Sequence, residues 1–175
     1  MLIIREATSE DAKQIAQLHT QSWRENYQGA LTEEYLKYRA DGEREAVWLK
    51  RFEQSPPNQL VLIGEWNHRF CGFICVFGNN HVKHGSVIDN LHVMSELKGS
   101  GIGTQLLKAA ALWSEQNYPD LGLYLEVLAC NPKAIGFYES LGAKFLQKAC
   151  WDAPCGSKVD EFVYGWSRPK LLLEE

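Results

Sequence analysis

The sequence lacks the features that mark membrane proteins, secreted proteins and disulfide scaffolds. None of its 175 residues lie in an apolar run of the ~18 residues that a membrane-spanning helix needs. The first residues, MLIIREATSEDAKQ, contain neither a basic segment nor a long apolar stretch, so we expect no signal peptide. The odd count of 5 cysteines fits reduced thiols better than a disulfide framework. We therefore expect a cytoplasmic protein with no membrane partner.

Metal-ligand patterns are scarce as well. Cys71 and Cys75 form one close pair of cysteines, and Cys150 and Cys155 form another. Neither pair has the Cys-x-x-Cys spacing or the nearby histidine pair that a zinc site requires. The net charge of −4 gives no general reason to expect binding to nucleic acid. We expect no metal cofactor and no nucleic-acid partner.

The length and the hydrophobic content favour one domain. A chain of 175 residues with 45% hydrophobic residues can bury a sizeable core. No internal repeat, low-complexity segment or long linker interrupts it. We predict a single domain over residues 1–175, with a core over residues 2–166 and a C-terminal tail over residues 167–175.

Hydrophobic spacing and turn residues predict a mixed order of strands and helices. Thr8 or Ser9 can cap a first helix, and a second helical region is expected to hold Trp23 and Tyr27. Further along, strands are predicted at 59–66, 70–78, 86–93, 121–128, 143–151 and 158–166, after a first strand at 2–6, and helices at 101–116 and 131–141. The resulting order, β-α-α-β-β-β-α-β-α-β-β, indicates an α/β (mixed α+β) domain with one sheet.

Three glycines at alternate positions, Gly99, Gly101 and Gly103, open the helix that follows the strand at 86–93. Without side chains there, the backbone can turn tightly and approach a ligand closely. The first N–H groups of a helix are unpaired and attract phosphate, and Lys98 adds a positive charge beside them. A purely structural turn is the alternative interpretation. The segment is not a Walker loop, and Thr104 stands where a dinucleotide fingerprint needs its third small residue.

A second motif follows about thirty residues later, where residues 131–143 read NPKAIGFYESLGA. Asn131 and Pro132 suit the N-cap and the first position of a helix. Gly142 suits the position after its last turn. Tyr138 lies seven residues after Asn131, two turns along and on nearly the same face.

With these two motifs in order, the sequence resembles the GNAT superfamily of N-acetyltransferases. Lys98-x-x-Gly101-x-Gly103 looks like the family's pyrophosphate loop, in which Gln or Arg stands where this sequence has Lys. Residues 131–143 match the family's second signature, and residues 4–12 and 22–29 resemble one of its branches. The resemblance spans residues 2–166.

This resemblance implies a GNAT-like fold, with one mixed, splayed sheet of about seven strands and helices on both faces. It also implies that acetyl-CoA, the expected co-substrate, occupies the notch between the fourth and fifth strands. The residues expected to bind it are Leu91, His92, Val93, Lys98, Gly99, Ser100, Gly101, Ile102, Gly103, Thr104, Asn131 and Tyr138. The implied reaction is acetyl transfer to a primary amine by direct attack in a ternary complex, with Tyr138 protonating the departing thiolate.

The amine must lose a proton before it attacks, because free amines are mostly protonated near pH 7. Asp89 and Glu126, on the central strands, are the candidate general bases, and His92 is a third. We favour Asp89, because it is the only carboxylate on the strand expected to present the thioester. A bulge in that strand would change the face to which Asp89 points.

The acceptor is expected to contact Trp23 and Tyr27. Together with Trp151 and Trp166, they would form an aromatic pocket for a cationic amine, although core packing alone can explain many tryptophans. A small-molecule amine is favoured. A protein or peptide N-acetyltransferase and a non-catalytic acyl-CoA-binding regulatory module stay open as alternatives, and the sequence leaves open whether the chain forms a homodimer.

Overall fold

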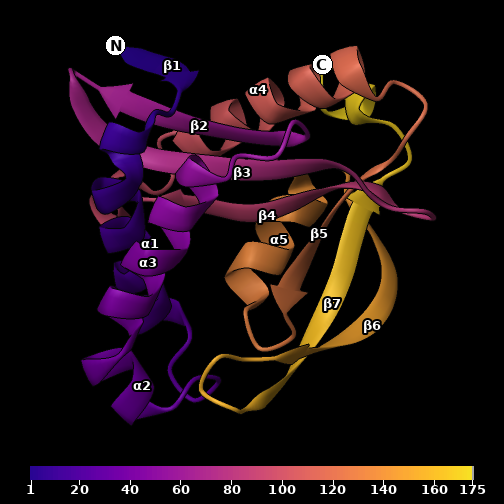
Figure 1. Cartoon of the computed structure of the whole chain (residues 1–175). Helices are drawn as coiled ribbons and strands as arrows, with labels where there is room; N and C mark the ends of the chain where they lie inside the picture. The colour runs from indigo at the N-terminus through magenta and orange to yellow at the C-terminus, as the bar shows by residue number, and fades with distance from the viewer. Residues whose placement is uncertain (175) are drawn as a thin grey trace.

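The computed structural model describes residues 1–174, which form a seven-stranded sheet of order β1-β2-β3-β4-β5-β7-β6 (Figure 1). The strands are β1 (Leu2–Glu6), β2 (Gln59–Trp66), β3 (Arg69–His81), β4 (Gly85–Val93), β5 (Leu123–Leu128), β6 (Lys144–Asp152) and β7 (Lys158–Trp166). Neighbouring strands are antiparallel except β4 and β5, which are parallel. The predicted fold class, a mixed sheet of seven strands, is confirmed.

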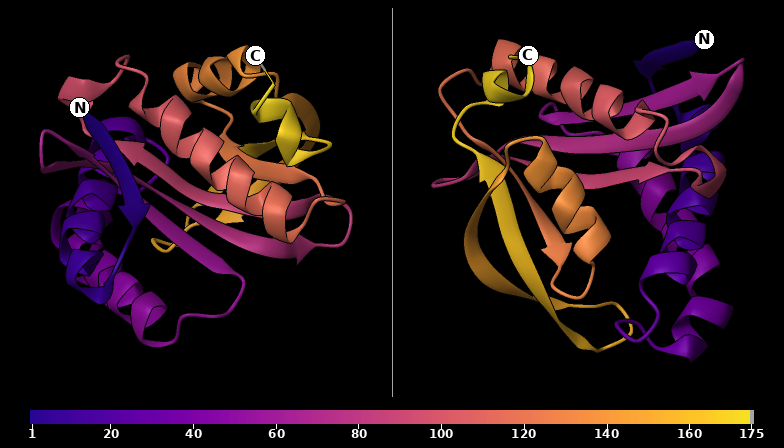
Figure 2. Two further views of the ribbon diagram at one scale, coloured as in Figure 1. Left: turned by 90° about the horizontal axis from the view of Figure 1, so that it is seen from above. Right: turned by 180° about the vertical axis from the view of Figure 1, so that it is seen from behind.

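Helices lie on both faces of this sheet, as Figures 1 and 2 show. They are α1 (Ala12–Asn26), α2 (Glu33–Tyr38), α3 (Ala40–Glu53), α4 (Ile102–Asn117) and α5 (Pro132–Ser140). Helices α1 and α3 pack on one face, and α4 and α5 on the other. The predicted division of the first helices was wrong: Trp23 lies inside α1, because no glycine or proline interrupts the helix before Tyr27 caps its end.

Strand β3 separates two hydrophobic cores. Since successive side chains of a strand point to opposite faces, Phe73 and Cys75 pack with α1 and α3, while Ile74 and Val76 pack with α4. Trp48 of α3 is fully buried in the first of these cores. Each such burial stabilises the fold by roughly 1.5–3 kcal/mol. The two cores fix the helices against the sheet and so position the loops at its centre.

The turn between β2 and β3 is the predicted hairpin. Asn67 and His68 have φ angles of 51° and 62°, both in the left-handed region that a tight two-residue hairpin turn requires. Trp66 and Arg69 pair directly across it.

The sheet opens between β4 and β5. These two strands pair over three residues only, from Ser86 with Leu123 to Ile88 with Leu125. Beyond Ile88, β4 continues its pairing with β3 alone. The two strands diverge from there and leave a notch between them, as Figure 1 shows.

The C-terminal segment docks onto α4. A short 3-10 helix, Pro169–Leu172, follows β7, and Leu172 is 3% exposed in the core beneath α4. Arg168 forms an ion pair of 3.0 Å with Asp120, which closes the loop after α4. Glu175, the last residue of the predicted tail, lies outside the described residues. Among residues 1–174, no helix combines the length and the apolar character needed to cross a membrane.

Candidate active site

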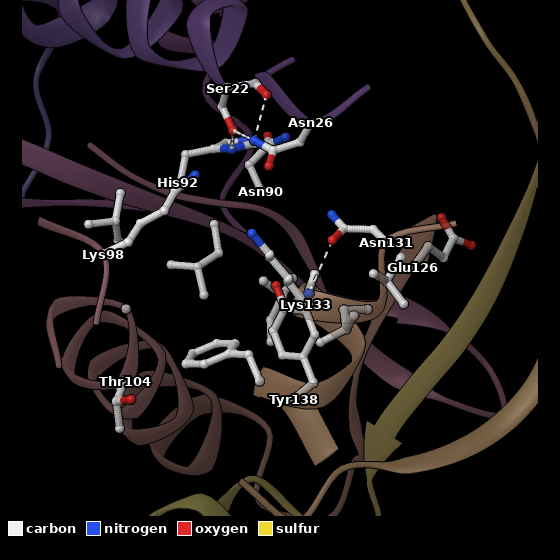
Figure 3. A pocket seen from close by; sticks show the side chains of 18 of the residues that line it. Ser22, Asn26, Asn90, His92, Lys98, Thr104, Glu126, Asn131, Lys133 and Tyr138 are labelled. Atoms are coloured by element: carbon white, nitrogen blue, oxygen red, sulfur yellow. Dashed lines mark hydrogen bonds between the residues drawn. The ribbon is translucent and has the colours of Figure 1, made fainter. Parts of the chain in front are cut away.

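A cavity of about 570 Å³ fills the notch between β4 and β5, and we call it the notch cavity. Its walls come from α1, the second half of β4, the glycine loop, the start of α4, β5 and α5 (Figure 3). Because β5 leaves β4 after Ile88, the edge of β4 from Asp89 to Val93 faces this cavity instead of another strand. Main-chain groups on such a free edge can hydrogen-bond an extended ligand as a strand would.

The glycine loop forms one end of the notch cavity. Gly99 and Gly101 have φ angles of 83° and 85°, a left-handed conformation that side chains other than glycine rarely adopt. Gly101 caps α4, so the first N–H groups of that helix have no intrahelical acceptor. A β-carbon at Gly103 would lie 3.5 Å from the Phe137 ring, in the space that lines the cavity. Unpaired N–H groups, the positive end of the helix dipole and Lys98 together fit a pyrophosphate.

Helix α5 forms the opposite wall. Asn131 caps it, as predicted, with its Oδ1 accepting a hydrogen bond of 3.2 Å from the Ala134 N–H. Its Nδ2 group makes no hydrogen bond within residues 1–174 and can donate to a ligand in the cavity that Asn131 lines. Tyr138 projects from the same helix into the cavity (Figure 3), and its hydroxyl makes no hydrogen bond within residues 1–174. Burial, and then the neighbouring Tyr27, raise the pKa of Tyr138 above its ordinary value, so the phenol keeps its proton at neutral pH.

A bulge in β4 decides where Asp89 points. Cys75 of β3 pairs with Asn90, and the next residue of β3 pairs with Ile88, so Asp89 is the extra residue. Both Asp89 and Asn90 bond to Arg51 of α3, at 2.7 Å and 3.0 Å. The bulge thus turns Asp89 toward α3, whereas Leu91 and Val93 pack toward α4.

The two remaining candidate bases differ in their surroundings. His92 hydrogen-bonds through Nδ1 to Ser22 Oγ at 2.8 Å. Burial and then Lys98 lower the pKa of His92 to about 4, so its ring is neutral and weakly basic near pH 7. Glu126 has no ion-pair partner within residues 1–174. Burial, and then the charge of Asp89, raise the pKa of Glu126.

A second cavity, of about 330 Å³, lies between α1, α3, β4, β5 and the β6–β7 hairpin, and we call it the aromatic cavity. Trp23 stacks on Tyr27 with 5.7 Å between ring centroids and meets Trp151 edge-on at the same distance. The aromatic cavity and the notch cavity share five lining residues: Tyr27, Ile88, Asp89, Asn90 and Glu126. A ligand in one cavity can therefore meet a ligand in the other beside Glu126.

The sequence profile of the acetyltransferase (GNAT) family matches residues 12–143, which hold both the glycine loop and Tyr138. The chain belongs to this family. Among curated protein sequences, none matches it.

Solved structures of acetyltransferases share the fold. An N-acetyltransferase, PaiA, from Thermoplasma acidophilum, whose structure contains coenzyme A, is 21% identical with a TM-score of 0.69, over 92% of this chain and 98% of that one. A GCN5-related N-acetyltransferase from Rhodopseudomonas palustris is 22% identical with a TM-score of 0.74, over 93% of both chains. A chimera of a spermidine N-acetyltransferase from Vibrio cholerae is 18% identical with a TM-score of 0.68, over 99% of both chains.

Within this GNAT chain, most residues predicted to contact acetyl-CoA line one cavity. The notch cavity is lined by Leu91, His92, Val93, Lys98, Gly99, Gly101, Gly103, Thr104, Asn131 and Tyr138. Ser100 and Ile102 are the exceptions. Ser100 Oγ donates to the carbonyl of Leu97, and Ile102 is buried in the core beneath α4. The Ser100 N–H also donates to the carbonyl of Leu97, at 3.3 Å, so of these two residues only Ile102 offers its main-chain N–H to a ligand.

Of the residues predicted to form the acceptor pocket, three line a cavity and one does not. Trp23 lines the aromatic cavity, Tyr27 lines both cavities, and Trp151 joins them. Trp166 lies elsewhere: it is buried beside α4, and its indole N–H donates to the carbonyl of Leu141. The prediction of Trp166 as a pocket residue was wrong, because Trp166 is the last residue of β7 and lies at the end of the strand away from the β6–β7 turn.

Several lining residues escaped the sequence analysis. Ser22 and Asn26 of α1, Asn90 of β4 and Lys133 of α5 line the notch cavity. Glu25 of α1 hydrogen-bonds to Ser95 and lies 3.6 Å from Lys98, so α1 also touches the glycine loop. The aromatic cavity adds His19, Arg44, Arg51, Asp152, Pro154 and Glu161. Ser22 and Asn26 lie within residues 22–29, and Lys133 lies within residues 131–143, so these three could have been suspected from the segments that resemble the family.

Proposed function

We propose that this chain transfers the acetyl group of acetyl-CoA to a primary amine of a small molecule. The observation that carries this proposal is the meeting of the two cavities beside Glu126 and Tyr27. One cavity fits a long ligand with a pyrophosphate, and the other fits a compact amine. The aromatic cavity, with a volume of about 330 Å³, matches the size of a small acceptor.

The notch cavity would hold acetyl-CoA, which supplies the activated acetyl group. Gly99, Gly101, Gly103 and the first N–H groups of α4 would bind the pyrophosphate, with Lys98 as the neighbouring cation. The free edge of β4 and Asn131 Nδ2 would orient the pantetheine arm. The presence of coenzyme A in the Thermoplasma acidophilum structure of the same fold supports this placement.

Tyr138 would act as the general acid. Its hydroxyl is free of other hydrogen bonds within residues 1–174, and its raised pKa keeps the proton on oxygen until the thiolate leaves. A positioned phenol can donate that proton to sulfur as the tetrahedral intermediate collapses. Main-chain N–H groups of β4 beside the thioester would stabilise the oxyanion.

Glu126 would act as the general base, in place of the Asp89 that the sequence favoured. Asp89 is engaged by Arg51, whereas Glu126 is free and stands where the cavities meet. The raised pKa of Glu126 brings it closer to that of the amine proton it must accept. The amine would then attack directly within a ternary complex.

The test is release of free thiol from acetyl-CoA in the presence of a panel of small amines and N-terminal peptides. We expect amine-dependent release with small amines and none with peptides. Release with peptides alone would support a protein N-acetyltransferase. Tight binding of acetyl-CoA without release, for every amine and peptide, would support a non-catalytic acyl-CoA-binding module.

A further inference from the structure

Trp23 contacts several of the other residues that line the aromatic cavity. Its ring meets His19 edge-on at 4.6 Å, and the guanidinium of Arg44 lies 4.8 Å from its centroid. The same ring also packs against Tyr27 and Trp151. The Trp23 indole thus contacts two residues with N–H donors, His19 and Arg44, as well as the aromatic residues of the cavity.

Two N–H groups of these residues, His19 Nε2 and Arg44 Nε, lack an acceptor. His19 is 2% exposed, and its Nδ1 accepts a hydrogen bond of 3.1 Å from the Trp48 indole. Burial lowers the pKa of His19, so the ring is neutral and its single proton lies on Nε2. Neither His19 Nε2 nor Arg44 Nε has a hydrogen-bond partner within residues 1–174, and both side chains line the aromatic cavity. Buried donors of this kind call for an oxygen acceptor on the ligand.

Two carboxylates of the same cavity lack a cation. Glu126 and Glu161 form no ion pair within residues 1–174. Burial, and then the charge of Glu126, raise the pKa of Glu161 to about 7, as expected of carboxylates that share a partly buried site. A bound cation between them would remove this repulsion.

The other charged groups of the cavity are already paired. Arg51 is paired with Asp89, and the exposed Asp152 is paired with Lys158 at 2.6 Å. Arg44 bonds to Glu43 at 3.0 Å through Nη2, which leaves its Nε free. The unmatched groups are therefore two carboxylates and two N–H donors.

We propose that the acceptor is a zwitterion, an amine that also carries a carboxylate, as a free amino acid does. Glu126 and Glu161 would hold its ammonium group, and His19 Nε2 with Arg44 would hold its carboxylate. Trp23, Tyr27 and Trp151 would pack its carbon atoms and the cation. A diamine would satisfy the carboxylates but leave both donors without an acceptor. This inference rests on the proposed function and names the substrate class of the same site.

The experiment compares matched acceptors with the intact enzyme and acetyl-CoA, by free-thiol release. Each of three sets contains an amino acid, its amide and its decarboxylated amine: leucine with leucinamide and 3-methylbutylamine, phenylalanine with phenylalaninamide and phenethylamine, and lysine with lysinamide and cadaverine. In at least one set we expect kcat/KM for the amino acid to exceed that of both partners by about 10-fold or more. Equal or faster reaction of the amides or of the decarboxylated amines, cadaverine included, in every set would overturn the inference and leave the proposed function standing. Absence of thiol release with all nine compounds would overturn both.

Arg44→Gln tests the proposed carboxylate contact itself. We expect KM for the best amino acid to rise about 10-fold, while kcat/KM for its decarboxylated amine stays within about twofold. Arg39→Gln is the matched control, since Arg39 is exposed and lines neither cavity. Thermal midpoints and acetyl-CoA affinity establish that the variants fold. If Arg44→Gln does not fold, Arg44→Lys keeps the charge, loses the Nε donor and should show the same KM effect. An equal loss for both compounds in either variant would contradict the proposed contact.

Discussion

The two cavities of this molecule differ in construction, and on the proposed function they would recognise their ligands by different means. The notch cavity uses main-chain groups, left-handed glycines and a helix N-terminus, which come from two short contiguous motifs. The aromatic cavity uses side chains that α1, α3, β5 and the β6–β7 hairpin bring together from distant parts of the chain. A site formed by the backbone tolerates many sequences around it, whereas a site formed by side chains changes its ligand with each substitution. One fold can thus keep a common co-substrate while its acceptor varies.

The largest expected effect belongs to Tyr138, which would act on the chemistry rather than on either ligand's binding. Tyr138→Phe removes the hydroxyl and should lower kcat by about 10²-fold, because no other group would donate a proton to the leaving sulfur. Affinity for acetyl-CoA, measured by calorimetry, should stay close to that of the wild type. An unchanged kcat would reduce Tyr138 to a packing residue of the notch cavity.

The next effect should separate backbone recognition from side-chain recognition. Gly103→Val places methyl groups in the notch cavity and should weaken acetyl-CoA binding about 30-fold, equivalent to ~2 kcal/mol. Gly103 is a better target than Gly101, whose φ of 85° would strain any side chain even without ligand.

Gly136→Val is the matched control for this substitution. Gly136 lies in a helix as well, has open space around it and lines neither cavity. Its variant should bind acetyl-CoA as the wild type does. Equal weakening in both variants would point to a general effect on helix stability.

A smaller effect is expected at Glu126, where the cavities meet. Below its pKa, Glu126 is protonated and cannot accept a proton, so kcat/KM should rise with pH through a midpoint above the ordinary carboxyl value. Glu126→Gln should remove this rising limb and lower kcat/KM roughly 10-fold, less than the 10²–10⁴ typical of proton transfer, because water that enters the open cavity can also accept the proton.

Asp89→Asn provides the comparison for Glu126→Gln. Its main consequence should be loss of the ion pair with Arg51, with the pH profile keeping its rising limb. A flat profile in Asp89→Asn, with a normal one in Glu126→Gln, would return the role of base to Asp89.

The smallest effect concerns the stability of the aromatic cavity without ligand. In the unfolded chain Glu161 ionises near pH 4.5, whereas in the folded protein it keeps its proton until about pH 7. The folded state therefore binds more protons between these values, and stability falls as pH rises through this window. Glu161→Gln should raise the thermal midpoint by about 2–4 °C at pH 8 and leave it unchanged at pH 4. A shift of the same size at both pH values would show that the carboxylate charge is not its cause.

The same contrast explains what the sequence could and could not reveal. Strand periodicity, the Asn67–His68 turn, the cap at Asn131 and the glycines of the loop are local signals, and each predicted its element correctly. The facing of Asp89 depends on a bulge, which a pattern of alternating residues does not record.

The aromatic cavity depends on tertiary packing throughout. His19 and Glu161 are separated by most of the chain, and neither stands in a motif. Trp151 and Trp166 looked alike in the sequence, yet one lines the cavity and the other is core, because Trp151 lies in β6 beside the turn of the β6–β7 hairpin and Trp166 ends β7 at the opposite end.

The short pairing of β4 with β5 has a mechanical consequence. Three residue pairs join the four strands β1 to β4 to the three strands β5 to β7, fewer pairs than at any other junction of the sheet. The two parts also share one hydrophobic core, in which Ile88 of β4 and Leu106 of α4 pack with Leu125 of β5. A long molecule lying in the notch would contact both parts of the sheet at once and limit their movement relative to each other. Occupancy of the notch would then stiffen the whole molecule, and the rigidity of the acceptor's cavity would depend on whether its neighbour is filled.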